Sequence, residues 1–236
     1  MNMDCPINKI KGRWERRKEA RPQELLAAAL DLFVERGYAA TRLDDVAAKA
    51  GVSKGTLYLY FTNKEDLFKA VIREHLLPVL AEAEQAMVHF EGHSRDLLRD
   101  LMMRWWNHMG ETQLSGITKL MLAESGNFPE VAQFYHDEFI MRGNAIIQRA
   151  LELGMARGEL RRLDPEQVTM VVVAPMIKLM LWKHSFATCQ VQQVPPVEFL
   201  NTYIDILFNG LLMPEKGVEK STEKSVEKSL EKQAGT

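Results

Sequence analysis

The segment from Ser53 to Phe61 carries polar side chains at a spacing suited to reading DNA. Leu57 and Phe61 are four residues apart, so on a helix they lie on one face and turn toward a small core. The remaining face presents an ammonium group and several hydroxyl groups, from Lys54, Thr56, Tyr58 and Tyr60. A lysine can donate to the edge of guanine, and a threonine methyl group can contact the methyl group of thymine. The pattern predicts contacts with the major groove of DNA or its rims.

Short helices on either side of a tight turn must position these side chains. We expect a helix from Thr41 to Ala50, capped by the Thr41 hydroxyl group and ended by Gly51, which tolerates a left-handed backbone. Ser53 should cap the next helix, and Asn63 the one after it. Phosphate groups should meet Thr41, Arg42 and Lys64, since Lys64 stands at the positive end of the helix that Asn63 caps. The full set of candidate DNA-binding residues is Thr41, Arg42, Ser53, Lys54, Gly55, Thr56, Tyr58, Tyr60 and Lys64.

A plain helical hairpin inside an all-α core is the alternative interpretation of this stretch. It accounts for Leu57 and Phe61 but leaves the outward Tyr58 and Tyr60 unexplained. The run GVSKGTLYLYFTNKEDLF resembles the DNA-binding signature of the TetR/AcrR family of one-component transcriptional regulators. The similarity extends back to the apolar positions before Gly37 and covers roughly residues 22–76. It implies a helix-turn-helix that binds double-stranded DNA, a homodimer, and a small effector bound elsewhere in the chain.

The composition fits a globular protein whose N-terminal part meets nucleic acid. Of the 236 residues, 46% are hydrophobic, yet no apolar run is long enough to span a bilayer, and the start of the chain lacks a secretory signal. Only Cys5 and Cys189 are cysteines, which favours a reducing cytoplasm. Residues 1–64 carry a net charge of +4, and residues 65–236 carry −6. This asymmetry assigns the nucleic-acid partner to the N-terminal part alone.

The helical periodicities predict an all-α fold of about nine helices in two parts. The resemblance implies that these are an N-terminal three-helix DNA-binding domain and a C-terminal helical effector-binding and dimerisation domain. The first helix should begin at Pro22 and end at Gly37, and a long helix from Asn63 should kink at Pro78. The predicted regions are a basic flexible arm (1–21), the helix-turn-helix domain (22–70), the ligand-binding and dimerisation domain (71–213) and a disordered tail of Glu-Lys repeats (214–236).

The last two predicted helices carry long apolar stripes. The run VTMVVVAP has high β-propensity, but apolar residues spaced alternately four and three apart indicate a helix from residue 165 to about 187. The spacing alone predicts burial. In the TetR family the last two helices pair with those of a second subunit, so the resemblance assigns these positions to a homodimer interface. They are Val168, Val172, Leu179, Trp182, Leu200, Tyr203, Leu207 and Leu211.

The middle of the chain is rich in methionine and aromatic side chains, which can repack around varied apolar ligands. Ordinary core is the alternative for most of them, and the adjacent Trp105 and Trp106 cannot face the same way. Because members of the family bind a small effector in this region, we expect a hydrophobic pocket here. Its candidate residues are Met102, Trp105, Trp106, Met109, Phe134, Tyr135, Phe139, Met176 and Met180.

The sequence gives little support for a catalytic, metal-binding or cofactor-binding function. No cysteine and histidine cluster has zinc spacing, no glycine-rich phosphate loop is present, and Ser185 beside His184 lacks the surroundings of a nucleophile. We therefore expect no catalytic site, no metal and no cofactor. The function predicted is a ligand-responsive regulator, a repressor that binds a palindromic operator as a homodimer and is released by a small hydrophobic effector. The alternative is a regulator of the same fold controlled by a protein partner or a metal.

Overall fold

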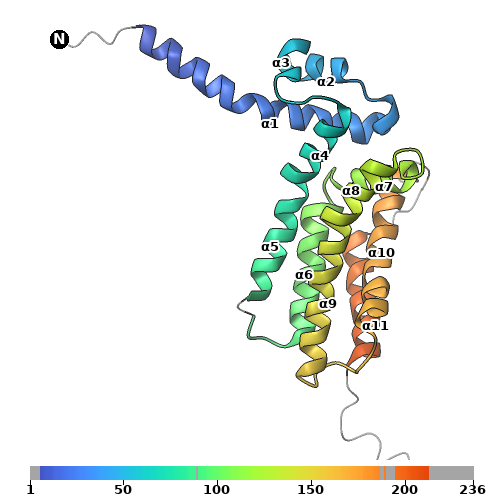
Figure 1. Cartoon of the computed structure of the whole chain (residues 1–236). Coiled ribbons are helices and arrows are strands. Elements are labelled where there is room, and N and C mark those ends of the chain that lie inside the picture. The colour runs from blue at the N-terminus through green and yellow to red at the C-terminus, as the bar shows by residue number, and fades with distance from the viewer. Residues whose placement is uncertain (1–5, 89, 187–188, 190–194, 213–236) are drawn as a thin grey trace, which may run out of the picture.

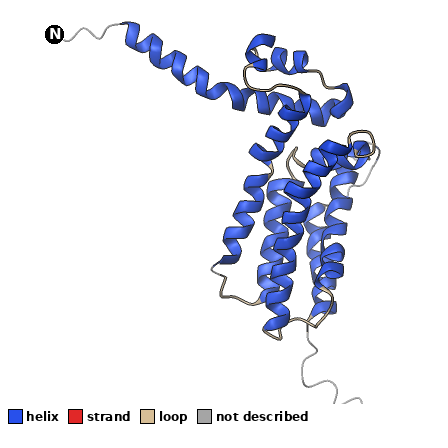
Figure 2. Ribbon diagram, viewed as in Figure 1, coloured by secondary structure: helices blue, strands red, loops and turns tan. Residues whose placement is uncertain are grey.

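A computed structural model of the chain describes residues 6–88, 90–186, 189 and 195–212, and these residues are almost entirely helical (Figures 1 and 2). Within these ranges, the extended structure is limited to a single bridge between Leu160 and Leu212. The all-α prediction is confirmed. The predicted Glu-Lys tail (214–236) and the first five residues of the predicted arm lie outside the described residues.

Four helices form the part of the molecule that we call the head. They are α1 (Pro6–Ala40), α2 (Leu43–Lys49), α3 (Lys54–Tyr58) and the first turns of α4 (Lys64–His75). Figure 1 shows α2 and α3 on one side of α1, and α4 descending from the head into the rest of the chain.

The remaining helices form an upright bundle that we call the body (Figure 1). It contains α5 (Leu77–Val88), α6 (Ser94–Trp105), the π-helical segment η1 (Trp106–Gly110), α7 (Ser115–Glu124), α8 (Pro129–Tyr135), the π-helical segment η2 (His136–Ile140), α9 (Met141–Ala156), α10 (Pro165–Ser185) and α11 (Pro196–Leu211). If α4 with α5, α6 with η1, and α8 with η2 and α9 each count as one interrupted helix, the described residues form the predicted nine helices.

The first helix begins earlier than the sequence analysis predicts. It starts at Pro6, so residues 6–21 are helical where we predicted a flexible arm, and Pro22 lies inside the helix instead of at its first turn. At Gly37, the predicted end, the backbone leaves the helical region with φ at +86°, and helical structure then continues to Ala40. Only glycine adopts this conformation without strain.

The long helix predicted to run through Pro78 is two helices in the structure. α4 ends at His75 and α5 begins at Leu77, with Pro78 in its first turn. Proline lacks the backbone N–H and its ring crowds the preceding turn, so the helix breaks on the N-terminal side of the proline. The junction between head and body is therefore a break centred on Leu76, two residues before the predicted kink.

The helical interpretation of VTMVVVAP is confirmed, since α10 runs unbroken from Pro165 to Ser185. It packs on α7, α9 and α11, and α6 packs on α5 and α9. Within the described ranges, no helix combines the length and the apolarity that crossing a bilayer requires.

Candidate nucleic-acid interface and ligand cavity

Helix α3 is built as the sequence predicts. The Ser53 hydroxyl group accepts a hydrogen bond from the Thr56 amide at 3.1 Å, which satisfies one of the free N–H groups at the start of the helix. Leu57 and Phe61 are buried, and the positive φ of Gly51 allows the turn that joins α2 to α3. Asn63 likewise caps α4 by accepting from the Asp66 amide at 2.8 Å.

The outer surface of α3 combines charged, aromatic and aliphatic groups. The side chain of Tyr58 is 45% exposed. Lys54 is exposed as well, and its ammonium group lies 2.8 Å from Asp44 and 5.9 Å from the centre of the Tyr58 ring. The hydrogen bond and charge of Asp44 raise the pKa of Lys54, which therefore stays protonated.

Two neighbouring positions differ from the sequence analysis. Tyr60 is only half exposed and packs beside Phe61, with ring centres 6.5 Å apart, so it does not face outward as Tyr58 does. Leu59, which the sequence analysis did not select, is 81% exposed. The signal that could have found it is its position two residues after the buried Leu57, which in helical backbone turns its side chain away from the core. An exposed leucine at this site offers an apolar contact to a groove.

Thr41 does not cap α2. Its side chain is buried, and its hydroxyl group lies 2.7 Å from the Gly37 carbonyl oxygen and 3.1 Å from that of Leu32. The residue at the start of α2 is Arg42, which makes no side-chain cap. Thr41 thus ties the end of α1 to the following loop, and its side chain is not available to a phosphate group. Arg42 remains exposed.

Lys64 also has a different position from the one predicted. Its ammonium group donates to the carbonyl oxygens of Tyr38 at 2.7 Å and Ala39 at 3.0 Å, and it lies 4.6 Å from the centre of the Tyr38 ring. Burial lowers the pKa of Lys64, while the charge of Glu124 acts in the opposite direction. Carbonyl groups at a helix end attract cations. Lys64 therefore stabilises the end of α1 instead of pointing to a phosphate group.

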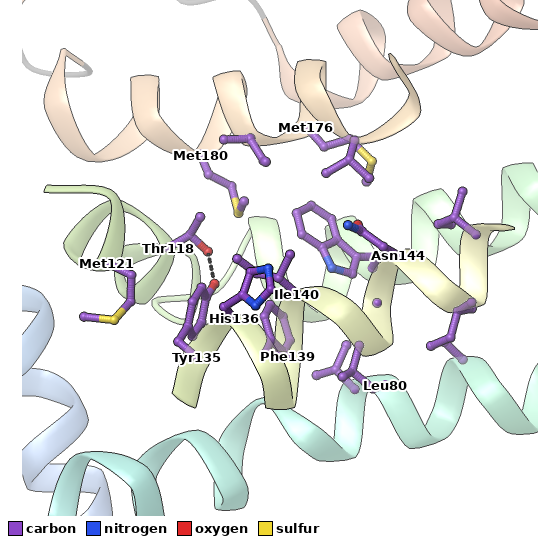
Figure 3. Close-up of a pocket in the computed structure, with 18 of the residues that line it drawn as sticks. Leu80, Thr118, Met121, Tyr135, His136, Phe139, Ile140, Asn144, Met176 and Met180 are labelled. Atoms are coloured by element: carbon purple, nitrogen blue, oxygen red, sulfur yellow. Dashed lines mark hydrogen bonds between the residues drawn. The ribbon is translucent and has the colours of Figure 1, made fainter. Parts of the chain in front are cut away.

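A cavity of about 550 Å³ lies inside the body, between α5, α6, α7, α10 and the continuous segment from α8 to α9. Figure 3 shows Met176 and Met180 of α10 on one side and Leu80 of α5 on the opposite side. His136, Phe139, Ile140 and Asn144 lie between them (Figure 3). Its lining is mainly apolar, as the methionine and aromatic content predicts.

Six of the nine candidate pocket residues line this cavity, namely Met102, Trp105, Tyr135, Phe139, Met176 and Met180. Trp106 and Met109 are instead buried in the core outside the lining. Phe134 also lies outside it, because its ring faces α4, where Lys69 and Arg73 lie 5.4 Å and 4.9 Å from its centre. Adjacent helical residues point in different directions, and the structure resolves which of each pair faces inward.

Three further walls were missed by the sequence analysis. α5 contributes Val79, Leu80 and Ala83, α7 contributes Thr118, Met121 and Leu122, and α9 contributes Gly143, Ile146 and Ile147. These aliphatic and small residues have the same periodicity as any core position. Their sequence therefore carries no signal that separates a cavity wall from ordinary packing.

The two π-helical segments of the described chain both border the cavity. Trp105 precedes η1, which carries His108, and η2 carries His136, Phe139 and Ile140. A π segment fits an extra residue into one turn and so changes which side chains face a neighbouring helix; such segments are frequent at functional sites. Their placement on two walls supports a ligand site.

Polar groups in the cavity are separated by depth. Inside, the hydroxyl groups of Thr118 and Tyr135 are 3.1 Å apart (Figure 3), and burial raises the pKa of Tyr135, so its phenol stays neutral. The exposed polar side chains are Glu82, Arg104, His108, Ser125, Gln133 and His136. His108 lies 2.9 Å from Glu82. The site therefore has an apolar interior and a charged rim.

Most of the predicted interface residues are buried within the chain itself. Val168, Val172, Leu179, Leu200, Leu207 and Leu211 belong to the core, and Val172 lines the cavity. Tyr203 is half exposed and donates to the Val171 carbonyl oxygen at 2.9 Å. Trp182 is exposed, as is Phe186 on the same stripe, together with apolar side chains outside the stripes: Met170, Val171, Val197 and Ile206. Of the predicted stripes, only Trp182 and Phe186 belong to the exposed apolar surface of α10 and α11.

The described residues contain no cluster of side chains suited to binding a metal ion. No three histidine, cysteine, aspartate or glutamate side chains come together there as potential ligands. His136 instead pairs with Asp137 at 2.8 Å.

Family models match two separate parts of the chain. Residues 25–71 match the description "Bacterial regulatory proteins, tetR family", and residues 91–188 match "Tetracyclin repressor-like, C-terminal domain". The first range contains the helix-turn-helix, and the second contains most of the cavity walls.

Two curated proteins illustrate how similarity is distributed. The chain is 27% identical over 147 residues to the fatty acid metabolism regulator protein of Bacillus subtilis, an alignment covering 61% of this chain and 74% of that protein. It is 40% identical over 70 residues to the HTH-type transcriptional activator FasR of Mycolicibacterium smegmatis, covering 30% of this chain and 32% of that one. The match thus spans about a third of FasR.

Solved structures share the fold at low identity. The transcriptional regulator FadR from Bacillus subtilis, in complex with stearoyl-CoA, has a TM-score of 0.67 and 22% identity, and covers 80% of this chain and 98% of its own. NalD, the secondary repressor of the MexAB-OprM multidrug efflux pump in Pseudomonas aeruginosa, has a TM-score of 0.67 and 20% identity, covering 84% and 100%.

Proposed function

Because the chain belongs to the TetR family of bacterial transcriptional regulators, we propose that it is a repressor that binds a palindromic operator as a homodimer. A small hydrophobic effector that enters the body cavity releases it from the operator. The observation that carries this proposal is the combination, in one chain, of an exposed α3 surface and a mainly apolar cavity of about 550 Å³.

The α3 surface supports DNA binding by its chemistry. Lys54 supplies a protonated donor, Tyr58 supplies a ring with a hydroxyl group, and Leu59 supplies an apolar contact. Lys54 must leave Asp44 to reach a base or phosphate, so the ion pair is exchanged on binding. Ser53, Gly55, Thr56, Tyr60 and Arg42 stay in the proposed interface around these three. Thr41 and Lys64 support it by holding the end of α1.

The effector is proposed to be a long acyl chain with a polar head. An apolar interior and a charged rim suit a molecule that is apolar over most of its length and anionic at one end. Arg104 and His108 at the rim can attract a carboxylate or phosphate by exchanging their present partners, Asp100 at 2.6 Å and Glu82 at 2.9 Å. The fatty acid metabolism regulator protein aligns with 61% of this chain, and the FadR structure holds stearoyl-CoA, which supports this ligand class for a cavity of the same fold.

The exposed apolar groups of α10 and α11 support a dimer. Scattered single apolar side chains are normal on a surface, but several on two adjacent helices indicate an interface. Two heads in one dimer would then meet half-sites about one helical turn of DNA, or a multiple of it, apart.

Substitutions on the head should separate DNA contacts from structural roles. Lys54→Ala should weaken operator binding and make its salt dependence shallower by about one unit of log–log slope. Thr56→Ala should change the preferred sequence. Lys64→Ala should lower the melting temperature and leave the salt slope unchanged, because the Lys64 ammonium group already bonds two carbonyl oxygens. Binding isotherms at several salt concentrations, on an operator recovered by selection from random DNA, measure these effects. A wild-type salt slope in Lys54→Ala would exclude the proposed contact.

A thermal-shift experiment tests the effector. Stearoyl-CoA and stearate should each raise the melting temperature, by roughly 5–10 °C at a hundred times the dissociation constant, while coenzyme A without an acyl chain should not. Emission from Trp105 should change in the same titration, since this ring lines the cavity.

The acyl ligand must then be added to the protein–operator complex, because binding alone does not shift the equilibrium between two states. Release of DNA by the acyl compounds, and not by coenzyme A, supports the proposal. Tight binding without any effect on DNA would contradict the repressor mechanism, and the absence of any thermal shift would contradict the ligand class.

A further inference from the structure

The end of α7 contacts the head through a carboxylate. Glu124, the last residue of α7, accepts hydrogen bonds from the backbone amides of Tyr38 at 3.0 Å and Ala39 at 3.1 Å, one on each carboxylate oxygen. These amides lie more than eighty positions away in sequence, at the end of α1. A negatively charged acceptor makes both hydrogen bonds stronger than those between neutral groups.

The local structure of α1 explains why these amides are available. Gly37 leaves the helical conformation, so the N–H groups that follow it lose the carbonyl partners of a continuous helix. Glu124 satisfies them from another element. A β-carbon on residue 37 would lie 2.6 Å from one Glu124 oxygen, so glycine is also needed for this close approach.

The same two residues are held through their carbonyl groups as well. The Lys64 ammonium group donates to the carbonyl oxygens of Tyr38 and Ala39, whereas Glu124 accepts from their amides. The Tyr38 ring packs edge-on against Phe128, which follows α7, with ring centres 4.7 Å apart. Burial, and then the charges of Glu65, Glu124 and Glu130, raises the pKa of Tyr38 to about 12.

The residues around Glu124 line the cavity. Met121, Leu122 and Ser125 do so from the same turn of chain, and Pro129 does so just after Phe128. A molecule that fills the cavity therefore touches the end of α7 within one or two residues of Glu124, the residue that contacts the head.

We propose that Glu124 is the positioning residue through which the cavity controls the head: it holds the end of α1 when the cavity is empty, and loses this hold when an effector displaces the end of α7. The inference rests on the proposed function for the identity of the two ligands, which are the DNA operator and the acyl effector. It assigns the coupling between them to one carboxylate.

Two substitutions and one control test the role. Glu124→Gln keeps the length of the side chain and loses one acceptor oxygen with the charge. Glu124→Asp keeps the charge but is too short to reach both amides. Glu130→Gln is the control, because this exposed carboxylate on α8 also acts on Tyr38 through its charge. Circular dichroism and melting temperature verify that each variant folds.

Operator binding with and without stearoyl-CoA is the measurement. Both Glu124 variants should bind the operator about tenfold more weakly without ligand, because a smaller fraction of heads is held in the binding position. Stearoyl-CoA should then have little further effect, so the ratio of the two dissociation constants falls toward one. Glu130→Gln should keep the wild-type ratio.

A residue with only a structural role would weaken binding equally in both conditions and leave the ratio unchanged; that result overturns the proposal, as does wild-type behaviour in both Glu124 variants. If stearoyl-CoA has no effect on the wild-type complex, the effector part of the proposed function fails. Glu124 is then judged without ligand: faster amide hydrogen exchange at Tyr38 and Ala39 together with weaker operator binding supports it, and no change in either overturns it.

Discussion

Ile206→Asp should convert the protein from a dimer into a folded monomer that binds its operator poorly. The Ile206 side chain is 66% exposed in the single chain, so a carboxylate there is solvated and leaves the fold intact. In a dimer formed through α10 and α11 the same carboxylate would lose its water among apolar groups, at a high cost in free energy. Losing the second reading head should weaken operator binding by a factor of roughly 10²–10⁴. Sedimentation at micromolar concentration and operator titration measure the two effects.

Met170→Asp, on α10, should give the same result, since Met170 is 69% exposed. Val88→Asp is the matched control, because Val88 has the same exposure but lies at the end of α5. Asp at Leu179 or Leu207 is a poorer test, because both are buried and the variant should unfold. A wild-type protein that sediments as a monomer, or an Ile206→Asp dimer, would rule out the proposed interface.

Trp106→Ala should be the most destabilising substitution of those considered. The ring is 1% exposed and its N–H donates to Glu111 at 3.1 Å. It fills the space above Gly110 so closely that a β-carbon at residue 110 would collide with it. Removing a buried tryptophan costs about 3–5 kcal/mol, which should lower the melting temperature by roughly 10 °C or more. Denaturant unfolding and a thermal scan measure both.

Trp105→Ala is the control for the predicted loss of stability in Trp106→Ala. Trp105 is half-buried at the cavity, so its loss should cost less stability and should mainly weaken acyl ligands and abolish their effect on fluorescence. Equal stability losses in the two variants, or a ligand effect confined to Trp106→Ala, would show that the two rings have been assigned to the wrong sides.

The tryptophan pair illustrates how far the sequence could predict the site. Helical spacing identifies one face of α6, but Trp105 and Trp106 are neighbours and periodicity cannot choose between them. The π segment that begins at Trp106 then alters the phase, so Met109 enters the core instead of the cavity. Where the helix is regular, as along α10 at Met176 and Met180, the predicted residues do line the cavity.

The head was predicted more completely, because its signals are local. Ser53 and Asn63 cap the helices that follow them, and Gly37 and Gly51 end the helices before them, each for a reason contained in a few residues. Lys64 was misplaced because its partners, the carbonyl oxygens of Tyr38 and Ala39, come from a distant part of the chain. Tertiary contacts of this kind leave no trace in spacing.

Helix α10 carries side chains that line the cavity, Val172 and Met176, and also exposed apolar side chains, Met170 and Trp182. If two chains pair through the exposed side, a ligand and a second chain touch the same helix. Where one of them alters the affinity of the other, the effect must be returned by the same factor, as thermodynamic reciprocity requires. The apparent affinity for an effector would therefore vary with the protein concentration at which it is measured, and dilution into the nanomolar range would itself act as a variable in every titration.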